Sequence, residues 1–436
     1  MSLDTSNYHH ISYYLTIDNF QQIFPDNDKQ KYGAIFTPFS FIETMFDYID
    51  VNSFSNPNLK WCDLGCGLGY FSIFLYFKLM DNLICIPDKS KRSEHIINNM
   101  IYMIDIQENY IPFLKKIFGN KANIICNDVL TWNPTISFDF VISNPPFHCN
   151  HIKQVPTNKE TKDLFTSSKT IWPKFIFKGI NLLNSTGHML MVVPSLWCKY
   201  DSYGIYDLII KRIIKLRLYN NTQINKIFNY QAQTPCSIFL ASKQILNHNN
   251  SFATFLMYDS ILQKYTSFSL YKNKQTIPME SISLCSRLFS YTLKYGNIEQ
   301  YCVRSKMPSI KVKLNNVNSE EYPFINIHST ILNIHKDVSQ PKLVIKYSNI
   351  PCAFNNKSKL ILAHKMYGFP FYDISGNYGI SNRDNYIIYN FNHEEFLLFQ
   401  SFTSSILFIF ILECFKYRMK MIEPCITMYI PNITNM

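Results

Sequence analysis

The first half of the chain alternates short apolar runs with longer amphipathic segments. Runs such as 138–143 and 188–194 are short and largely apolar, which is typical of strands buried on both faces of a parallel sheet. Segments such as 39–49 repeat apolar residues every three or four positions and predict helices. This alternation predicts a doubly wound α/β domain with a mainly parallel sheet from about residue 35 to 245. The expected strands are 59–64, 101–106, 122–128, 138–143, 188–194, 217–220 and 234–242, and the expected helices are 39–49, 70–80, 109–118, 171–183 and 206–216, with a polar insert at 81–99.

Beyond residue 245 the regular alternation is lost. Strand-like pieces at 342–348, 359–365 and 385–391 predict a smaller mixed α+β domain. The apolar stretch 396–415 contains Gln, Ser, Thr and Glu, so we expect one buried helix there and no membrane span. The predicted organisation is a lead-in at 1–30, an α/β domain at 31–245 and a second domain at 246–436.

Composition narrows the class of protein. A hydrophobic fraction of 47% with 17% charged residues indicates a globular protein and not a disordered tail. The net charge of +11 favours a polyanionic partner, although a codon bias toward Lys would give the same excess. The 12 Cys include no Cys-x-x-Cys pair, which predicts free thiols and no metal site. Without an apolar signal sequence at the N-terminus, we expect a cytoplasmic protein, or one in a viral or host intracellular compartment.

Three glycines lie between the first predicted strand and the helix that follows it. Gly65, Gly67 and Gly69 allow the backbone to approach a ligand closely, and the helix N-terminus supplies N–H donors. A dinucleotide-binding turn or a simple tight turn would have the same glycine spacing. Asp63 precedes the glycines and favours a ligand with an ammonium group, such as methionine, because a carboxylate repels a pyrophosphate.

Two further aspartates end the next two predicted strands. Asp105 is placed to accept both hydroxyl groups of a ribose, and Asp128 could accept the amine of an adenine. Taken singly, an Asp at a strand end is more often a turn or helix cap. With Asp63, however, these residues follow three successive strands, and together they predict a pocket for a nucleoside that carries an amino acid.

The tetrapeptide Asn144-Pro145-Pro146-Phe147 follows the fourth predicted strand. The two prolines stiffen the turn and offer carbonyl groups without a competing N–H. The Asn144 side-chain oxygen and the Pro145 carbonyl can then accept the two hydrogens of a planar amine and localise its lone pair for attack on a methyl group. Phe147 would stack on the ring that carries the amine. An ordinary Pro-Pro turn before a loop is the alternative.

These blocks, in this order, resemble the gamma-class (Taq-type) N6-adenine DNA methyltransferases of restriction-modification systems and their relatives in large DNA viruses. The resemblance covers about 31–243 and implies a Rossmann-like class I methyltransferase fold, S-adenosyl-L-methionine as cofactor, and a target-recognition domain at 246–436. The matching blocks are GAIFTP (33–38), DLGCGLG (63–69), MIDIQ (103–107), NDVLTW (127–132), SNPPF (143–147), 182–197 and 224–240.

The resemblance also implies roles for individual residues. Thr37 and Pro38 would close over the methionine end of the cofactor. Phe228 would stack on the flipped-out base opposite Phe147, although a core aromatic at this position is equally expected. The chain departs from the family pattern by having Phe147 where Tyr is commoner, and by an insert between Gly69 and Asp105.

Other substrates remain open at this point. The same tetrapeptide occurs in enzymes that methylate a glutamine of release factors or a guanine amine of ribosomal RNA, and N4-cytosine enzymes usually have Ser in place of Asn144. A catalytically inactive nucleic-acid-binding subunit is a further alternative. We expect double-stranded DNA as partner, a monomer, no membrane association, and room for a separate restriction endonuclease, because the first 30 residues leave no space for a nuclease domain.

Overall fold

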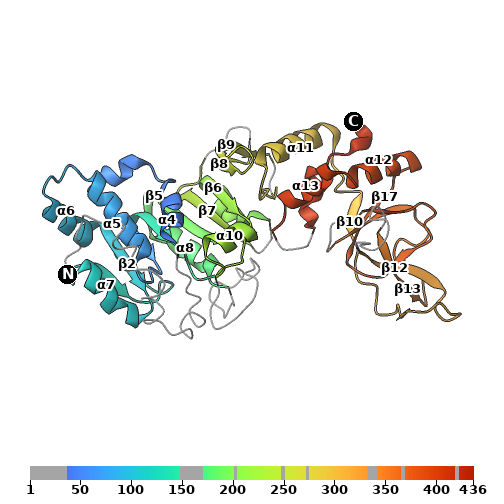
Figure 1. Cartoon of the computed structure of the whole chain (residues 1–436), viewed down its shortest axis with the longest axis horizontal. Coiled ribbons are helices and arrows are strands. Elements are labelled where there is room, and N and C mark those ends of the chain that lie inside the picture. The colour runs from blue at the N-terminus through green and yellow to red at the C-terminus, as the bar shows by residue number, and fades with distance from the viewer. Residues whose placement is uncertain are drawn as a thin grey trace. The chain divides into compact units, whose positions relative to one another are not determined.

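The structure is a computed structural model, and it describes residues 37–147, 170–200, 204–246, 251–271, 274–331, 341–364, 369–417 and 422–436. The chain divides into two compact units (Figure 1). The N-terminal unit comprises Met1–Tyr258 with Lys264–Lys274, and the C-terminal unit comprises Asp259–Gln263 with Gln275–Met436.

The N-terminal unit is built on a nine-stranded sheet. Its strand order is β3-β2-β1-β4-β5-β7-β6-β8-β9. Strands β1 to β5 are parallel to one another, whereas β7 runs antiparallel to both β5 and β6. The carboxyl ends of β1 to β5 therefore meet at one edge of the sheet, where the predicted site residues follow. The strands are β1 Trp61–Leu64, β2 Ile101–Asp105, β3 Asn123–Cys126, β4 Phe138–Ser143, β5 Leu183–Pro194, β6 Ile213–Tyr219, β7 Cys236–Ser242, β8 Ala253–Asp259 and β9 Lys264–Leu270.

Helices pack on both faces of this sheet, as the predicted α/β class requires. Helix α5 packs beside α4 and β2 within the main core cluster. Helix α8 packs on β4 and β5, where a Cβ atom on Gly179 would lie 2.8 Å from Met189. The helices are α4 Phe39–Phe46, α5 Tyr70–Asn82, α6 Lys89–His95, α7 Ile111–Phe118, α8 Trp172–Leu182, α9 Tyr206–Ile210 and α10 Asn221–Ile227, with a π-helix at Ile96–Met100 and 3₁₀ turns at Val51–Ser55, Glu108–Tyr110 and Ser195–Cys198.

Two segments differ from the sequence-based expectation. The predicted helix 206–216 is wrong, because α9 ends at Ile210 and β6 begins at Ile213. The alternation of half-buried Lys215 and Arg217 with buried leucines has the period of a strand, and β7 supplies the hydrogen-bonding partner. The polar insert at 81–99 contains α6, which is anchored by the buried Arg92 donating to the Met80 and Ile86 carbonyls.

The sheet also continues past residue 245, because β8 and β9 extend it beyond β6. A cation–aromatic contact joins this extension to α4. The Lys215 ammonium lies 4.7 Å from the ring centre of Tyr48 and 4.3 Å from that of Tyr265, and it donates to the Asp47 carbonyl at 3.0 Å. Asp47 is the C-cap of α4, so a cation there interacts favourably with the helix dipole.

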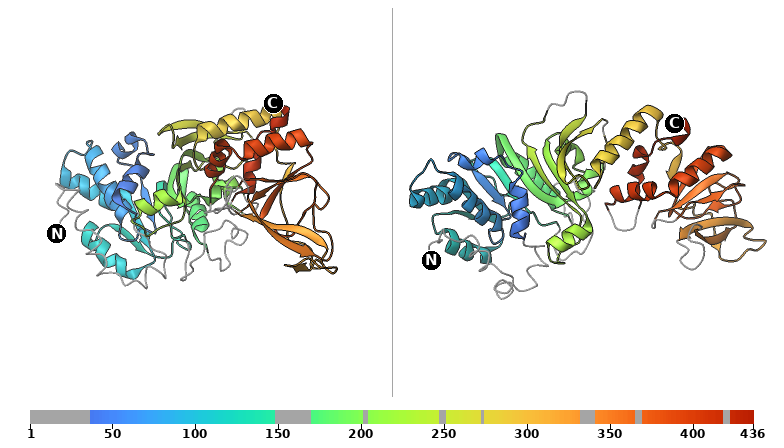
Figure 2. Two further views of the ribbon diagram at one scale, coloured as in Figure 1. Left: turned by 45° about the vertical axis from the view of Figure 1, so that its right-hand side comes forward. Right: turned by 45° about the horizontal axis from the view of Figure 1, so that its top comes forward.

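The C-terminal unit contains two four-stranded sheets and three α-helices within its described residues. The sheet orders are β10-β17-β14-β15 and β11-β13-β12-β16. Helix α12 packs against β14 and β15, and Figure 2 shows the red helices beside the orange strands of this unit. The elements are α11 Ile282–Tyr295, β10 Cys302–Arg304, β11 Leu314–Asn315, β12 Phe324–Ile331, β13 Lys342–Ser348, β14 Lys359–Ala363, β15 Phe371–Asp373, β16 Gly379–Ile380, β17 Asn385–Tyr389, α12 His393–Thr403 and α13 Ile406–Cys414, with 3₁₀ turns at Pro424–Tyr429 and Ile433–Asn435.

The single helix expected at 396–415 is wrong, because two helices, α12 and α13, cover this stretch. Ser405 accepts a hydrogen bond from the Phe408 N–H at 3.2 Å and starts the second helix as its N-cap. Over the described part of the chain, no single helix has the length and apolar composition to cross a membrane. Helices α12 and α13 reach both only as a pair, with a bend of 66° between them.

Candidate active site

The glycine turn after β1 has the backbone that its sequence requires. Gly65, Gly67 and Gly69 have φ values of 69°, 53° and 80°, a region in which a side chain would be strained. The Gly65 and Cys66 N–H groups both donate to the Ile104 carbonyl at 2.9 Å, which ties the turn to β2. A Cβ atom on Gly67 would have no atom within 4 Å, so a ligand could approach the backbone closely there.

Asp63 is buried at the end of β1 and accepts hydrogen bonds from Ser72, through the hydroxyl at 2.8 Å and through the backbone N–H. Burial raises the pKa of the Asp63 carboxyl to about 7, and the Ser72 bond opposes this shift only in part. Burial outweighs the hydrogen bonds from Ser72, so a negative charge on this carboxylate is incompletely compensated. It fits a cationic ligand group.

Asp105, at the end of β2, is tied into the same turn. Its two carboxylate oxygens accept from the Gly67 N–H at 2.8 Å and the Gln107 N–H at 2.9 Å. Burial raises the pKa of Asp105 as well, against these backbone bonds. The Ile106 N–H also donates to this carboxylate, so of its roughly four acceptor sites about one remains for a ligand hydroxyl. Among the residues that the structure describes, the buried Gln107 side-chain oxygen has no hydrogen-bond partner, and this further acceptor was missed by the sequence reasoning although it lies in the quoted MIDIQ block.

Asp128 lies beside Asp105, because the N–H of the preceding Asn127 donates to the Asp105 carbonyl at 2.9 Å. Its side chain accepts from the Leu130 N–H at 2.9 Å, and its own carbonyl accepts from Thr131 and Trp132. Asp128 therefore stabilises a turn, which was the alternative considered for it from the sequence.

The Asn-Pro-Pro-Phe turn follows β4, the neighbour of β1. Ser143 donates to the Leu64 carbonyl at 2.6 Å and so ties the two strand ends together. The Asn144 side-chain nitrogen donates to the Thr37 hydroxyl oxygen at 2.8 Å, across 107 positions of the chain. In this bond Nδ2 is directed at Thr37, so Oδ1 is directed away from that hydroxyl. Thr37 thus contacts the Asn-Pro-Pro-Phe turn, a partner that the sequence did not predict.

The start of α4 gathers the other aromatic groups of the site. Phe39 packs on Tyr70, the first residue of α5, with ring centres 5.0 Å apart. Phe41 contacts Phe228 edge-on at 5.4 Å. Since Thr37 precedes this helix, the Asn-Pro-Pro-Phe turn, the first residue of α5 and the C-cap of α10 all contact the segment 37–41. Pro38 serves as its N-cap.

The two candidate stacking rings differ in exposure. Phe147 is half-buried at the edge of the core cluster. Phe228 is only 6% exposed and belongs to the core, so its ring has little free surface in this conformation. Tyr230, two positions later, is 74% exposed and has a φ of 63°, which turns it away from the core. This residue was missed by the sequence reasoning, although the spacing Phe-x-Tyr offers both rings as candidates.

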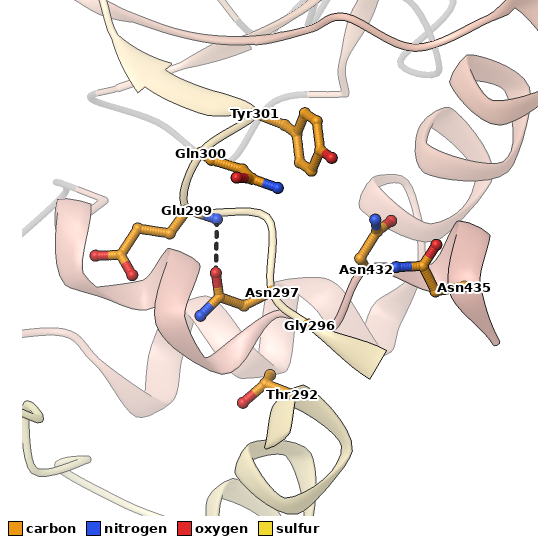
Figure 3. A pocket seen from close by; sticks show the side chains of 8 residues that line it. All are labelled: Thr292, Gly296, Asn297, Glu299, Gln300, Tyr301, Asn432 and Asn435. Atoms are coloured by element: carbon orange, nitrogen blue, oxygen red, sulfur yellow. Dashed lines mark hydrogen bonds between the residues drawn. The ribbon is translucent and has the colours of Figure 1, made fainter. Parts of the chain in front are cut away.

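Residues 33–36 of the N-terminal block lie outside the described residues, as does the lead-in at 1–30. A hollow of about 490 Å³ lies in the C-terminal unit, within the described residues, and Figure 3 shows the polar side chains that line it. No predicted site residue lines this hollow. Its lining residues are Thr292, Gly296, Asn297, Glu299, Gln300, Tyr301, Asn432 and Asn435.

The parallel strands, the reversed β7 and the glycine turn after β1 define the class I methyltransferase fold, as expected. Residues 70–236 match the family model of the Eco57I restriction-modification methylase. The predicted resemblance to restriction-modification methyltransferases is therefore confirmed over this part of the chain.

Two curated relatives are type II methyltransferases. The first, M.VspI of a Vibrio species (strain 343), is 26% identical over 199 residues, which cover 43% of this chain and 43% of that protein. The second, M.TthHB8I of Thermus thermophilus, is 28% identical over 94 residues, or 19% and 22% of the two chains. The chain thus spans less than half the length of either relative. Among solved structures, the type IIG restriction endonuclease BpuSI is similar with a TM-score of 0.46 and 11% identity, over 92% of this chain and 59% of its own.

The raised pKa of Asp63 makes stability depend on pH. Because the folded-state pKa lies above the unfolded value, the contribution of Asp63 is fully present below about pH 4 and is lost as the pH rises to about 7. We expect wild type to lose roughly 4 kcal/mol of unfolding free energy over this window relative to Asp63→Asn, which does not titrate. Urea unfolding at several pH values measures this difference. Parallel pH profiles for the two proteins would show that Asp63 titrates normally.

Proposed function

We propose that this protein transfers a methyl group from S-adenosyl-L-methionine to the N6 amine of an adenine that is rotated out of duplex DNA. The observation that carries the proposal is the hydrogen bond from Asn144 to Thr37, because it presents an oriented acceptor at the end of β4, beside the buried carboxylate that ends β1. The chemistry needs no metal and no covalent nucleophile.

The polar groups that follow β1, β2 and β3 match the methionine, ribose and adenine parts of the cofactor in that order. Asp63 would accept from the methionine ammonium, and Asp105 and Gln107 from the ribose hydroxyls. Ile106, between Asp105 and Gln107 in the sequence, is exposed and offers an apolar surface to the purine ring. Asp128 would accept a hydrogen bond from the amine of that ring. S-adenosyl-L-methionine, when bound, supplies a methyl group that the positive sulfonium makes electrophilic.

The Asn144 turn acts on the nitrogen that is methylated. Its Oδ1 and the Pro145 carbonyl accept the two amine hydrogens, which draws them from the ring plane and leaves the lone pair on nitrogen for in-line attack. These dipoles are held in advance, by the Thr37 bond on one side and by the rigid prolines on the other, so they need not reorganise as charge develops.

The base must leave the helical stack to reach this turn, because the adenine amine is buried in a duplex. Phe147 is proposed for one face of the flipped base and Phe228 for the other. The burial of Phe228 makes Tyr230 its rival, since a base can stack only on a ring with an open face.

The C-terminal unit is proposed as the target-recognition domain. The basic net charge of +11 supports a DNA partner through contacts with phosphate groups. A monomer in the cytoplasm or in a viral or host compartment, with a separate restriction endonuclease as partner, completes the proposal. The same turn could serve an amine of RNA or the amide of a protein glutamine, and the products distinguish these cases.

Thr37 is expected to act through Asn144. Thr37→Val removes the hydroxyl acceptor and keeps the shape, so the Asn144 amide is no longer held and kcat should fall about 10- to 100-fold. Cofactor affinity should stay near wild type, and Thr37→Ser should restore most of the rate. Methyl transfer from labelled cofactor to duplex DNA measures kcat, with calorimetry for the affinity.

Asn144→Ala is the reference variant for this experiment, and we expect it to bind cofactor and transfer no methyl group. The mechanism would be contradicted by normal turnover of Asn144→Ala. If Thr37→Val weakened only cofactor binding, Thr37 would belong to the cofactor pocket, as the sequence suggested, and not to the catalytic turn.

The stacking role can be assigned by comparing two variants. A stacking ring is needed most when flipping is costly, so its removal should lower kcat/KM more on a paired target than on a mismatched one. We expect this mismatch-dependent loss, of about 5- to 100-fold, for Phe228→Ala. Tyr230→Ala is the matched control on an exposed ring. The opposite result, with the loss confined to Tyr230→Ala, would transfer the role to Tyr230 and leave Phe228 as a core residue.

A further inference from the structure

Two short loops of the C-terminal unit leave the same end of one strand pair. Residues 354–358 lead into β14, and residues 374–378 follow β15. Strands β14 and β15 are antiparallel, with Lys359 directly opposite Asp373. We call these two segments the clamped loop pair.

A buried ion pair closes both loops. The Lys359 ammonium lies 2.5 Å from Asp373 Oδ2, and the two side chains are 0% and 3% exposed. The same ammonium donates to the Phe354 and Lys357 carbonyls of the first loop at 3.1 and 3.0 Å. The Asp373 carboxylate accepts from two N–H groups of the second loop, those of Asn377 at 2.9 Å and Tyr378 at 3.0 Å. Apart from their contact with each other, Lys359 and Asp373 thus use these side-chain hydrogen bonds to hold the backbones of the two loops.

The loops are also joined through their backbones. The Asn356 N–H donates to the Gly376 carbonyl at 2.9 Å. Gly376 has a φ of 69°, and a Cβ atom on it would lie 2.6 Å from the backbone nitrogen of Lys357. Phe354 and Asn356 have φ values of 61° and 57°, which cost a non-glycine residue about 1 kcal/mol or more each. The loop pair therefore has one definite shape, held against local strain.

Stability alone does not account for this construction. A buried ion pair repays its desolvation with difficulty, and an apolar pair of similar size often gives equal stability. What the ion pair provides is a fixed geometry for the residues above it. Buried hydrogen bonds that fix the backbone of strained loops are an arrangement that can hold a recognition surface in one geometry.

The exposed residues of the clamped loop pair have the chemistry that reads DNA. Asn356 and Asn377 carry carboxamides, which pair with the N6 and N7 positions of adenine, and Lys357 carries an ammonium for guanine or phosphate. Ser375 offers a hydroxyl, and Ile374 an exposed apolar group that suits a thymine methyl. Neither loop contains an acidic residue, so nothing there repels a phosphate backbone.

We propose that the clamped loop pair enters the major groove of duplex DNA and reads part of the target sequence, with Lys359 and Asp373 as its positioning residues. The inference rests on the proposed function and goes beyond it by assigning base reading to named residues. The exposed carboxamides and the lack of acidic residues favour DNA over a protein partner.

The first test removes the exposed groups. Methylation mapped by sequencing defines the target of the wild type, and kcat/KM is then measured on that duplex and on duplexes with single base changes. Asn356→Gly, which tolerates the positive φ, and Asn377→Ala should each lose about 10- to 100-fold in kcat/KM and discriminate less at one base pair. Lys357→Ala should weaken binding and lower the salt dependence.

Matched controls are available in the same unit. Asn318→Ala and Lys294→Ala remove the same groups from exposed positions outside the loops, and they should keep wild-type kcat/KM and discrimination. Cofactor affinity should be unchanged in all of these variants. Wild-type rates and discrimination in the three loop variants would overturn the proposal.

The second test addresses the ion pair. Lys359→Met with Asp373→Leu should keep most of the unfolding free energy yet raise KM for DNA about tenfold or more, with kcat near wild type, because the loops lose their ties. A fall in stability without a change in KM would make the pair merely structural. Should this double variant fail to fold, the loop variants still decide the proposal.

Failure of the inference can be told apart from failure of the proposed function. Fluorescence anisotropy with a labelled duplex measures DNA binding without any methyl transfer. If the wild type methylates DNA and the loop variants behave like it, only the inference fails. If the wild type neither binds nor methylates duplex DNA, both fail.

Discussion

The hydrogen bond between Asn144 and Thr37 is the interaction on which the proposed chemistry depends. An asparagine amide presents a donor on one side and an acceptor on the other, and only the acceptor is useful toward an amine. In this structure Nδ2 donates to the hydroxyl of Thr37, the residue that leads into α4, and Oδ1 is directed away from that hydroxyl. That helix is in turn held at its other end, where Lys215 binds the carbonyl of its C-cap residue. A contact on β6 thus contributes to the position of the Asn144 amide, which follows β4.

The cofactor side of the site follows a similar logic. The glycine turn is bound to Asp105 and to the β2 backbone, so its shape is set before any ligand arrives. Asp63 accepts hydrogen bonds from Ser72, but burial outweighs them and raises its pKa. A cationic ligand would remove that cost. The glycine turn is therefore held in one shape by hydrogen bonds, whereas the negative charge of Asp63 is only partly compensated and would attract a cation.

Much of this edge could be predicted from the sequence, because the ends of parallel strands meet wherever the strands do. Residues 63, 105, 128 and 144 needed only the order of the strands to be placed together. The partner of Thr37 and the burial of Phe228 could not be predicted, since both depend on how α4 packs. The buried pair Lys359 and Asp373 was missed for a related reason: charged residues look exposed in a sequence until a fold pairs them.

The most direct measurement of the central claim is the identity of the methylated product. The full chain would be incubated with labelled S-adenosyl-L-methionine and, in parallel, duplex DNA, ribosomal RNA and release factor, and the digested products would be identified by mass. The account predicts N6-methyladenine from DNA and no label in the other two. N4-methylcytosine, or label in RNA or in a glutamine, would contradict the adenine assignment, and the absence of any label would contradict the proposed enzyme itself.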